Sequence, residues 1–183
     1  MAGCGTTKVV DSTGKKAIVS DPCEELQQQQ PAKRAVGKGT HFKEMTARNI
    51  AEAQGRAQFA RALSAAVKTA TDEQGYSFEL YSADAKTGGA VTDQGSKSND
   101  LVSSVANEVV ANTVVIKTSK YQLPNDQFEV WVCLEYQKSV AEMAAEVAKK
   151  VAQRIPDEQK MKMNFEFDRY RERIEKELEK NQQ

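Results

Sequence analysis

A strict alternation of residue types over residues 128–136 is the feature that most constrains the fold. Every second position is apolar: Phe128, Val130, Val132, Leu134 and Tyr136. Because successive side chains of a strand point to opposite faces, this period predicts a β-strand with one apolar face that another element must cover. A β-branched run at residues 113–116 precedes it, and Pro124-Asn125-Asp126 supplies turn residues between the two. The sequence therefore predicts an antiparallel hairpin.

A long helix upstream is predicted to cover the apolar face. Small and apolar residues recur there at steps of three and four. They are Ile50, Ala53, Ala57, Ala60, Leu63, Val67 and Ala70. Before the helix, residues 35–39 predict a short strand that ends in flexible glycines, and Thr40 is expected to cap the first helical turn. The alanines would let this helix lie close on a sheet.

The C-terminal half is predicted to be mainly helical. Ser139 and Glu142 fit a capping box, so a helix is expected to begin there and to end before Pro156. A shorter helix is expected to begin at residues 98–100. Beyond Pro156, apolar residues at 161, 163, 165 and 167 alternate with polar ones, which predicts an extended segment before a final helix. The apolar positions of these two helices are Leu101, Val105 and Val109, and Tyr170, Ile174 and Leu178.

These elements predict an α+β fold. We expect a small antiparallel sheet of about three or four strands packed against a long N-terminal helix, with further shorter helices and a C-terminal helix. The predicted domain spans residues 34–155, with a mobile loop at 72–99 where glycines and polar residues gather. Residues 156–183 form the extended segment and a charged helix.

The first residues indicate how the chain is anchored. Met1-Ala2-Gly3-Cys4 resembles the end of a lipobox, in which small residues flank the cleaved bond and the cysteine becomes the acylated N-terminus. No apolar run approaches the roughly 20 residues that a membrane span needs, so a lipid at Cys4 would have to anchor the chain. Residues 5–33 are polar and predict a flexible tether with a reach of about 30 Å. The alternative is a plain disordered tail with a free cysteine.

Two further cysteines remain if Cys4 is acylated. Cys23 and Cys133 are then two in number and can pair with each other, because an envelope compartment permits disulfides. Such a disulfide would fix the tether to the sheet. The alternative is that Cys133 is a small buried apolar residue and Cys23 a loose thiol. The sequence leaves both possibilities open.

The sequence offers no recognisable catalytic, metal or cofactor motif. The charges of the 26 basic and 26 acidic residues cancel, so no net positive electrostatic field favours the binding of nucleic acid. His41 is the single histidine and lacks partners at metal-ligand or catalytic spacing. Glu129 and Glu135 would lie about 20 Å apart along one strand, which is too far for paired acid and base catalysis. We expect neither an enzyme nor a bound cofactor or small-molecule substrate.

Two regions are candidate interaction surfaces. The second face of the strand at 128–136 combines Trp131 with Glu129, Cys133 and Glu135, and large aromatics are enriched where proteins meet. Either a partner or the chain's own C-terminal segment is expected to cover it. The loop at 72–99 carries a second set of aromatic candidates, which are Tyr76, Phe78 and Tyr81. A merely solvated loop is the alternative there.

The combined pattern resembles the bacterial twenty-kilodalton outer-membrane lipoprotein family, whose relatives include flagellar basal-disc lipoproteins. The resemblance is carried by the glycine-containing strand at 36–39, the helix with Ala53, Arg56 and Ala57, and the segment Phe-Glu-Val-Trp-Val-Cys-Leu-Glu at 128–135. It implies a compact α+β domain, an acylated N-terminal cysteine and, in some relatives, assembly into rings or discs. No catalytic residues come with it.

We therefore expect a lipid-anchored protein of the outer membrane, on its periplasmic side or at the cell surface, with a non-catalytic role in structure or assembly. Its expected partners are the membrane, through the lipid, and further copies of itself or other envelope proteins. A monomeric binding module that uses the loop at 72–99 is the alternative function.

Overall fold

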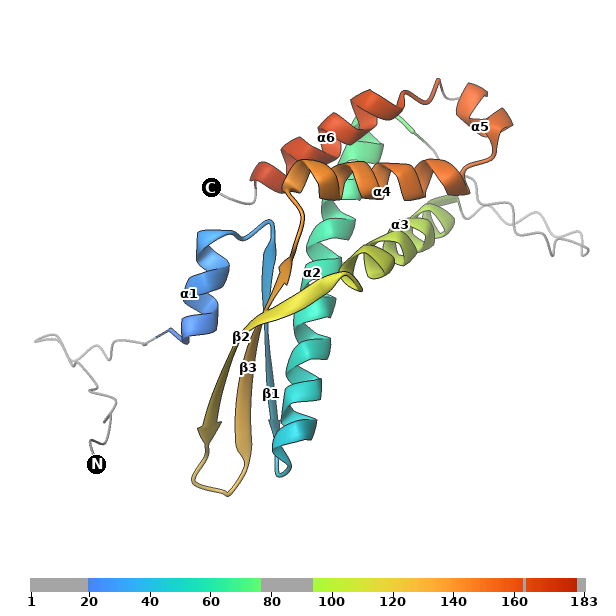
Figure 1. The fold of residues 1–183 in the computed structure, drawn as a ribbon. Helices are drawn as coiled ribbons and strands as arrows, with labels where there is room; N and C mark the ends of the chain where they lie inside the picture. The colour runs from blue at the N-terminus through green and yellow to red at the C-terminus, as the bar shows by residue number, and fades with distance from the viewer. Residues whose placement is uncertain (1–19, 77–93, 163, 181–183) are drawn as a thin grey trace, which may run out of the picture.

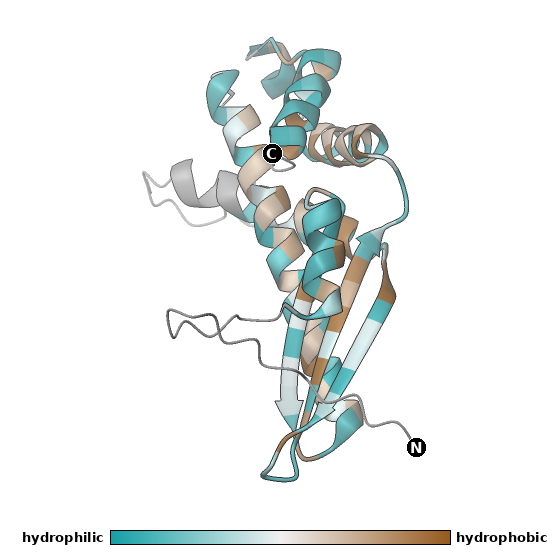
Figure 2. Ribbon diagram, turned by 90° about the vertical axis from the view of Figure 1, so that its left-hand side faces the viewer, coloured by the Kyte–Doolittle hydropathy of each residue, from teal (hydrophilic) through white to brown (hydrophobic). Residues whose placement is uncertain are grey.

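Three strands form a single antiparallel sheet in the order β1-β3-β2. They are β1 (Arg34–His41), β2 (Thr113–Gln122) and β3 (Phe128–Tyr136). The computed structural model describes residues 20–76, 94–162 and 164–180. The predicted hairpin joins β2 to β3, and its turn includes Asp126 at a positive φ of 60°. The central strand β3 is the most hydrophobic of the three, as Figure 2 shows.

The helix α2 (Glu44–Glu73) runs along one face of the sheet and then extends beyond it (Figure 1). Its first half packs on β1 and β3. The small core between them consists of Ala47, Ala51, Val130 and Val132. The fold class is α+β with a long helix on a three-stranded sheet, as the sequence predicted.

Two glycines of β1 bring α2 unusually close to the sheet. A Cβ atom at Gly37 would lie 1.8 Å from the carbonyl oxygen of Ala51, and one at Gly39 would lie 2.0 Å from that of Ala47. Both contacts are with helix backbone, which no rotamer change can relieve. Glycine is therefore required here by the distance between strand and helix rather than by a turn.

The second half of α2 enters a helical core. It packs there on α3 (Gln94–Val110) and α6 (Phe167–Lys180), and α4 (Val140–Arg154) packs in turn on α3 and α6. The short helix α5 (Asp157–Lys162) lies on the connection between α4 and α6. Fully buried side chains from each long helix include Leu63, Val105, Val147 and Ile174. The capping box at Ser139 and Glu142 is confirmed. None of the helices in the described part of the chain is long and apolar enough to span a bilayer.

A short helix, α1 (Pro22–Gln29), covers the opposite face of the sheet (Figure 1). The prediction of a flexible tether up to residue 33 is therefore wrong for this segment. Asp21 and Glu24 form a capping box, and Pro22 occupies the first helical turn, where its missing N–H costs nothing. The polar composition that suggested disorder belongs to the helix face turned to solvent.

Three local predictions are also wrong. Thr40 lies within β1, and Lys43 precedes α2 without a side-chain cap. The buried stripe in the first half of α2 does not include the predicted positions Ile50, Ala53 and Ala57, which are half-buried or exposed. The buried positions there are Ala47, Ala51, Gly55 and Phe59. Residues 157–162 form α5 rather than an extended segment.

Candidate functional site

The second face of the sheet is divided between a part under α1 and a part that α1 leaves open. The strand register places Val36 beside Cys133 and Lys38 beside Trp131 on this face. Cys133 is fully buried, whereas Trp131 is half-buried and Lys38 is exposed. Thr40, beside Glu129, is also exposed. The candidate surface is therefore the open part of this face, which lies beside the N-terminal end of α1: Ser119 and Tyr121, the β2 partners of Trp131 and Glu129, contact Cys23 and Asp21.

Trp131 is held at the centre of a polar cluster on this open part. Its Nε1 donates a hydrogen bond to Glu129 Oε1 at 2.8 Å. Lys38 Nζ forms an ion pair with Glu129 Oε2 at 2.7 Å and lies 4.9 Å from the centroid of the Trp131 ring. We call Lys38, Glu129 and Trp131 the tryptophan cluster. Burial by itself would raise the pKa of Glu129, but hydrogen bonds from Lys38 and Trp131 outweigh it and hold that pKa below its ordinary value.

Glu135, the other predicted carboxylate, has a different role. It pairs with Arg34, whose Nε lies 2.5 Å from Glu135 Oε2, and Arg34 also donates to the Leu26 carbonyl of α1 at 2.9 Å. Glu135 thus helps to fix the C-terminal end of α1 over the sheet. It does not belong to the open surface with Glu129 and Trp131.

Cys23 and Cys133 are both free thiols, and both are completely buried between α1 and the sheet. Cys23 is therefore not the loose thiol of the sequence-based alternative. Its Sγ lies 3.9 Å from the Lys117 carbonyl oxygen and 3.8 Å from Ser119 Oγ. Burial raises the pKa of each thiol to about 11, so both are protonated near neutral pH.

The aromatic candidates of the loop at 72–99 do not form an open surface in the described residues. Tyr76 is buried, and its ring packs against Phe165 and Tyr170 at centroid distances of 5.2 and 5.8 Å. Its hydroxyl accepts a hydrogen bond from the Glu166 backbone. Tyr76 therefore belongs to the helical core. Phe78 and Tyr81 lie outside the described residues, as does Cys4.

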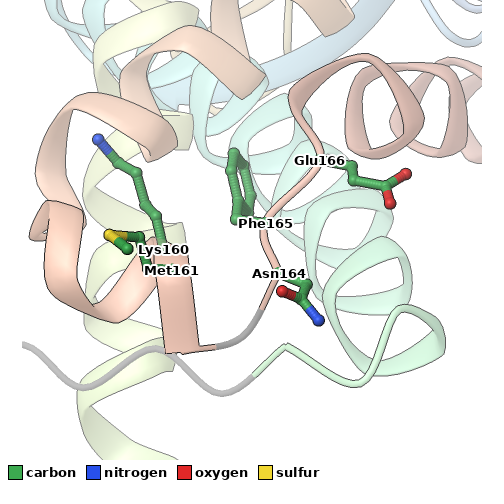
Figure 3. A pocket seen from close by; sticks show the side chains of 5 residues that line it. All are labelled: Lys160, Met161, Asn164, Phe165 and Glu166. Carbon is green, nitrogen blue, oxygen red and sulfur yellow. The ribbon is translucent and has the colours of Figure 1, made fainter.

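Two surface hollows in the described part of the chain are lined by residues that form no catalytic arrangement. One lies beside the connection from α5 to α6 and is lined by Lys160, Met161, Asn164, Phe165 and Glu166 (Figure 3). In this view the Phe165 ring stands between Lys160 and Glu166, whose charged ends point apart. A second hollow between α2 and α3 is lined by alanines, serines, Arg61 and Asn107. Within the described ranges, His, Cys, Asp and Glu residues form no group that could hold a metal ion.

His41 lies at the end of β1 and has a local structural role. Its Nδ1 accepts a hydrogen bond from the Lys43 backbone, which shapes the connection into α2. Directly after it, Phe42 and Met45 are 63% and 68% exposed. Sequence reasoning missed this exposed apolar pair. Its signal was the placement of two large apolar residues outside the helical stripe, Phe42 in the connection and Met45 in the first turn of α2.

Comparison with models of known protein families and with curated protein sequences finds no match to this chain.

Proposed function

We propose that this protein is a lipid-anchored envelope protein with a non-catalytic role in assembly, and that it self-associates or docks onto an envelope complex. The anchor is Cys4, on the ground of the lipobox-like sequence around it. The docking surface is the open part of the second sheet face, and the tryptophan cluster is the observation that carries this part of the proposal.

The tryptophan cluster has the physical properties of an interface anchor. Trp131 is fixed by a hydrogen bond and a covering cation, so little side-chain entropy is left to lose when a partner binds. Tryptophan is among the residues most enriched in binding hot spots, and a surrounding polar rim excludes water from such a centre. Lys38 and Glu129 supply one positive and one negative charge at the rim, which suits a partner whose surface charges are arranged in the complementary pattern.

The arrangement supports assembly better than catalysis. The charged groups of the cluster neutralise one another, so none is left as an acid, base or nucleophile. The exposed pair Phe42 and Met45 follows directly after β1, the strand that carries Lys38. Exposed apolar side chains of this size are also common on protein contact surfaces.

Site-specific photo-crosslinking in cells that produce the protein tests this proposal. A photoreactive amino acid at Thr40, which is exposed beside Glu129, should give covalent adducts with a further copy or with an envelope protein. The matched control places the same group at Lys149, an exposed position of α4 in the helical half.

Adducts from Thr40 that disappear when Trp131→Ala is added would support the docking surface. Mass spectrometry of the adduct identifies the partner and separates self-association from docking onto another protein. Equal adduct yields from Thr40 and Lys149, or no adducts from Thr40, would contradict the proposal.

A further inference from the structure

The helix α1 is held on the sheet by few contacts. Cys23 is its single buried residue. Beyond the Arg34 contact, Tyr121 donates its hydroxyl to Asp21 Oδ2 at 2.7 Å. A helix that buries so little apolar surface contributes little free energy of docking, and such elements open locally more easily than a core does. An additional link between α1 and the sheet would therefore change its behaviour strongly.

Both buried thiols lie at this contact, Cys23 over β2 and Cys133 on the adjacent strand β3. Cys133 lies on the central strand, on the face that α1 covers, and Lys117 is its cross-strand partner. The Sγ of Cys23 lies 3.9 Å from the Lys117 carbonyl oxygen. Paired residues of neighbouring antiparallel strands have Cα atoms about 4.5–5.5 Å apart, so the Cys23 thiol lies against the strand position that is adjacent to Cys133. A disulfide needs Cα atoms about 4.4–6.8 Å apart, so α1 has to move toward β3 for the two sulfurs to bond.

We infer that Cys23 and Cys133 are a redox pair that forms an intramolecular disulfide and thereby locks α1 onto the sheet. The oxidant is a disulfide, either of low molecular weight or of a protein thiol–disulfide oxidase. The thiolate of one cysteine attacks this disulfide, forms a mixed disulfide and releases one thiol. The second cysteine then displaces the second thiol. The protein loses two hydrogens, and the oxidant is reduced to two thiols.

The disulfide would fix α1 on the same face of the sheet that carries the tryptophan cluster. In the reduced chain, α1 can leave the sheet and expose Cys133 and the strand positions beside it. In the oxidised chain it cannot, and the chain between residues 23 and 133 is closed into a loop of about 110 residues, which destabilises the unfolded state. The inference does not depend on the proposed function, because it concerns only contacts within one chain.

Oxidation of the purified full chain tests the inference. Cys4→Ser removes the third thiol, and the protein is then incubated with oxidised glutathione. We expect the intact mass to fall by two hydrogens, and peptide mapping without reduction to find the Cys23 peptide joined to the Cys133 peptide. The matched control carries Cys23→Ser in addition and has a single thiol.

Recovery of both cysteines as free thiols would overturn the inference, as would separate glutathione adducts on each of them. A disulfide that links two chains would also overturn it. Mapping of the chain without any substitution, after the same treatment, guards against a folding defect in the variants.

Discussion

At the scale of single residues, the contact between sheet and helix depends on Gly37 and Gly39. Any Cβ atom at Gly37 would enter the backbone of α2 at Ala51, so helix and strand would have to separate. We expect Gly37→Ala to lower the free energy of unfolding by about 3 kcal/mol or more. Urea denaturation measures this. Thr40→Ala, on the exposed side of the same strand, is the control and should change stability by no more than about 0.5 kcal/mol. Equal urea midpoints for the two variants would contradict the close approach of α2 to β1.

The two buried thiols make the free energy of unfolding depend on pH in the alkaline range. In the folded protein the pKa of each is raised to about 11 by burial, whereas the ordinary value is 9.0. Their contribution to stability is therefore complete below pH 9 and is lost as the pH rises toward 11, because the unfolded chain releases these protons first. Under reducing conditions, the stability advantage of wild type over the double variant Cys23→Ala, Cys133→Ala should shrink across this window. A constant difference from pH 8 to 11 would contradict the burial of the thiols.

At the scale of elements, the docking of α1 depends on Asp21. Its carboxylate caps the helix through the Cys23 backbone at 2.7 Å and also accepts the Tyr121 hydroxyl. Asp21→Ala removes both contacts at a cost of about 1–2 kcal/mol, which should release α1 more often. In reduced protein we expect alkylation of Cys133 to become roughly ten times faster, measured by peptide mass spectrometry. Gln28→Ala, at an exposed position of the same helix, should leave the rate unchanged. If both variants react at the wild-type rate, α1 does not control access to Cys133.

Elements whose apolar residues recur at a regular spacing could be predicted from the sequence. Elements without such a spacing could not. The alternation of apolar and other residues that ends at Tyr136 predicts β3, because only one orientation of such a strand buries all of its alternating apolar side chains. The first half of α2 is different, since alanines and other small residues occur on several of its faces. Its buried stripe was therefore misplaced. The short helix α1 has a single buried residue, so no period of burial revealed it.

The candidate site could be predicted only in part, for a related reason. Trp131 was found because it interrupts the polar set of an alternating strand. Its contact with Lys38 depends on the pairing of β1 with β3, which brings together residues far apart in the chain. The sequence predicts a loop at Tyr76 because glycines and polar residues gather in the stretch 72–99. Its partners Phe165 and Tyr170 come from the other end of the chain.

At the scale of the whole molecule, α2 joins the sheet and the helical core into one structure. Its first half packs on β1 and β3, and its second half contacts α3 and α6 (Figure 1). Trp131, the single tryptophan, reports on the sheet, whereas far-ultraviolet circular dichroism reports mainly on the helices. We expect both signals to change at the same urea concentration, because neither half can unfold without disrupting α2. A tryptophan transition well before the loss of helix would show that the sheet unfolds separately.

The proposed role requires that this domain be held at a membrane by its N-terminus. The most direct test is the intact mass of the protein extracted from the membranes of cells that produce it. We predict a chain that begins at Cys4 and carries a mass increase of diacyl or triacyl size, with the lipid located on the N-terminal peptide. A chain that retains Met1 and a free Cys4 thiol would contradict the anchor and, with it, the proposed place of this protein in the cell envelope.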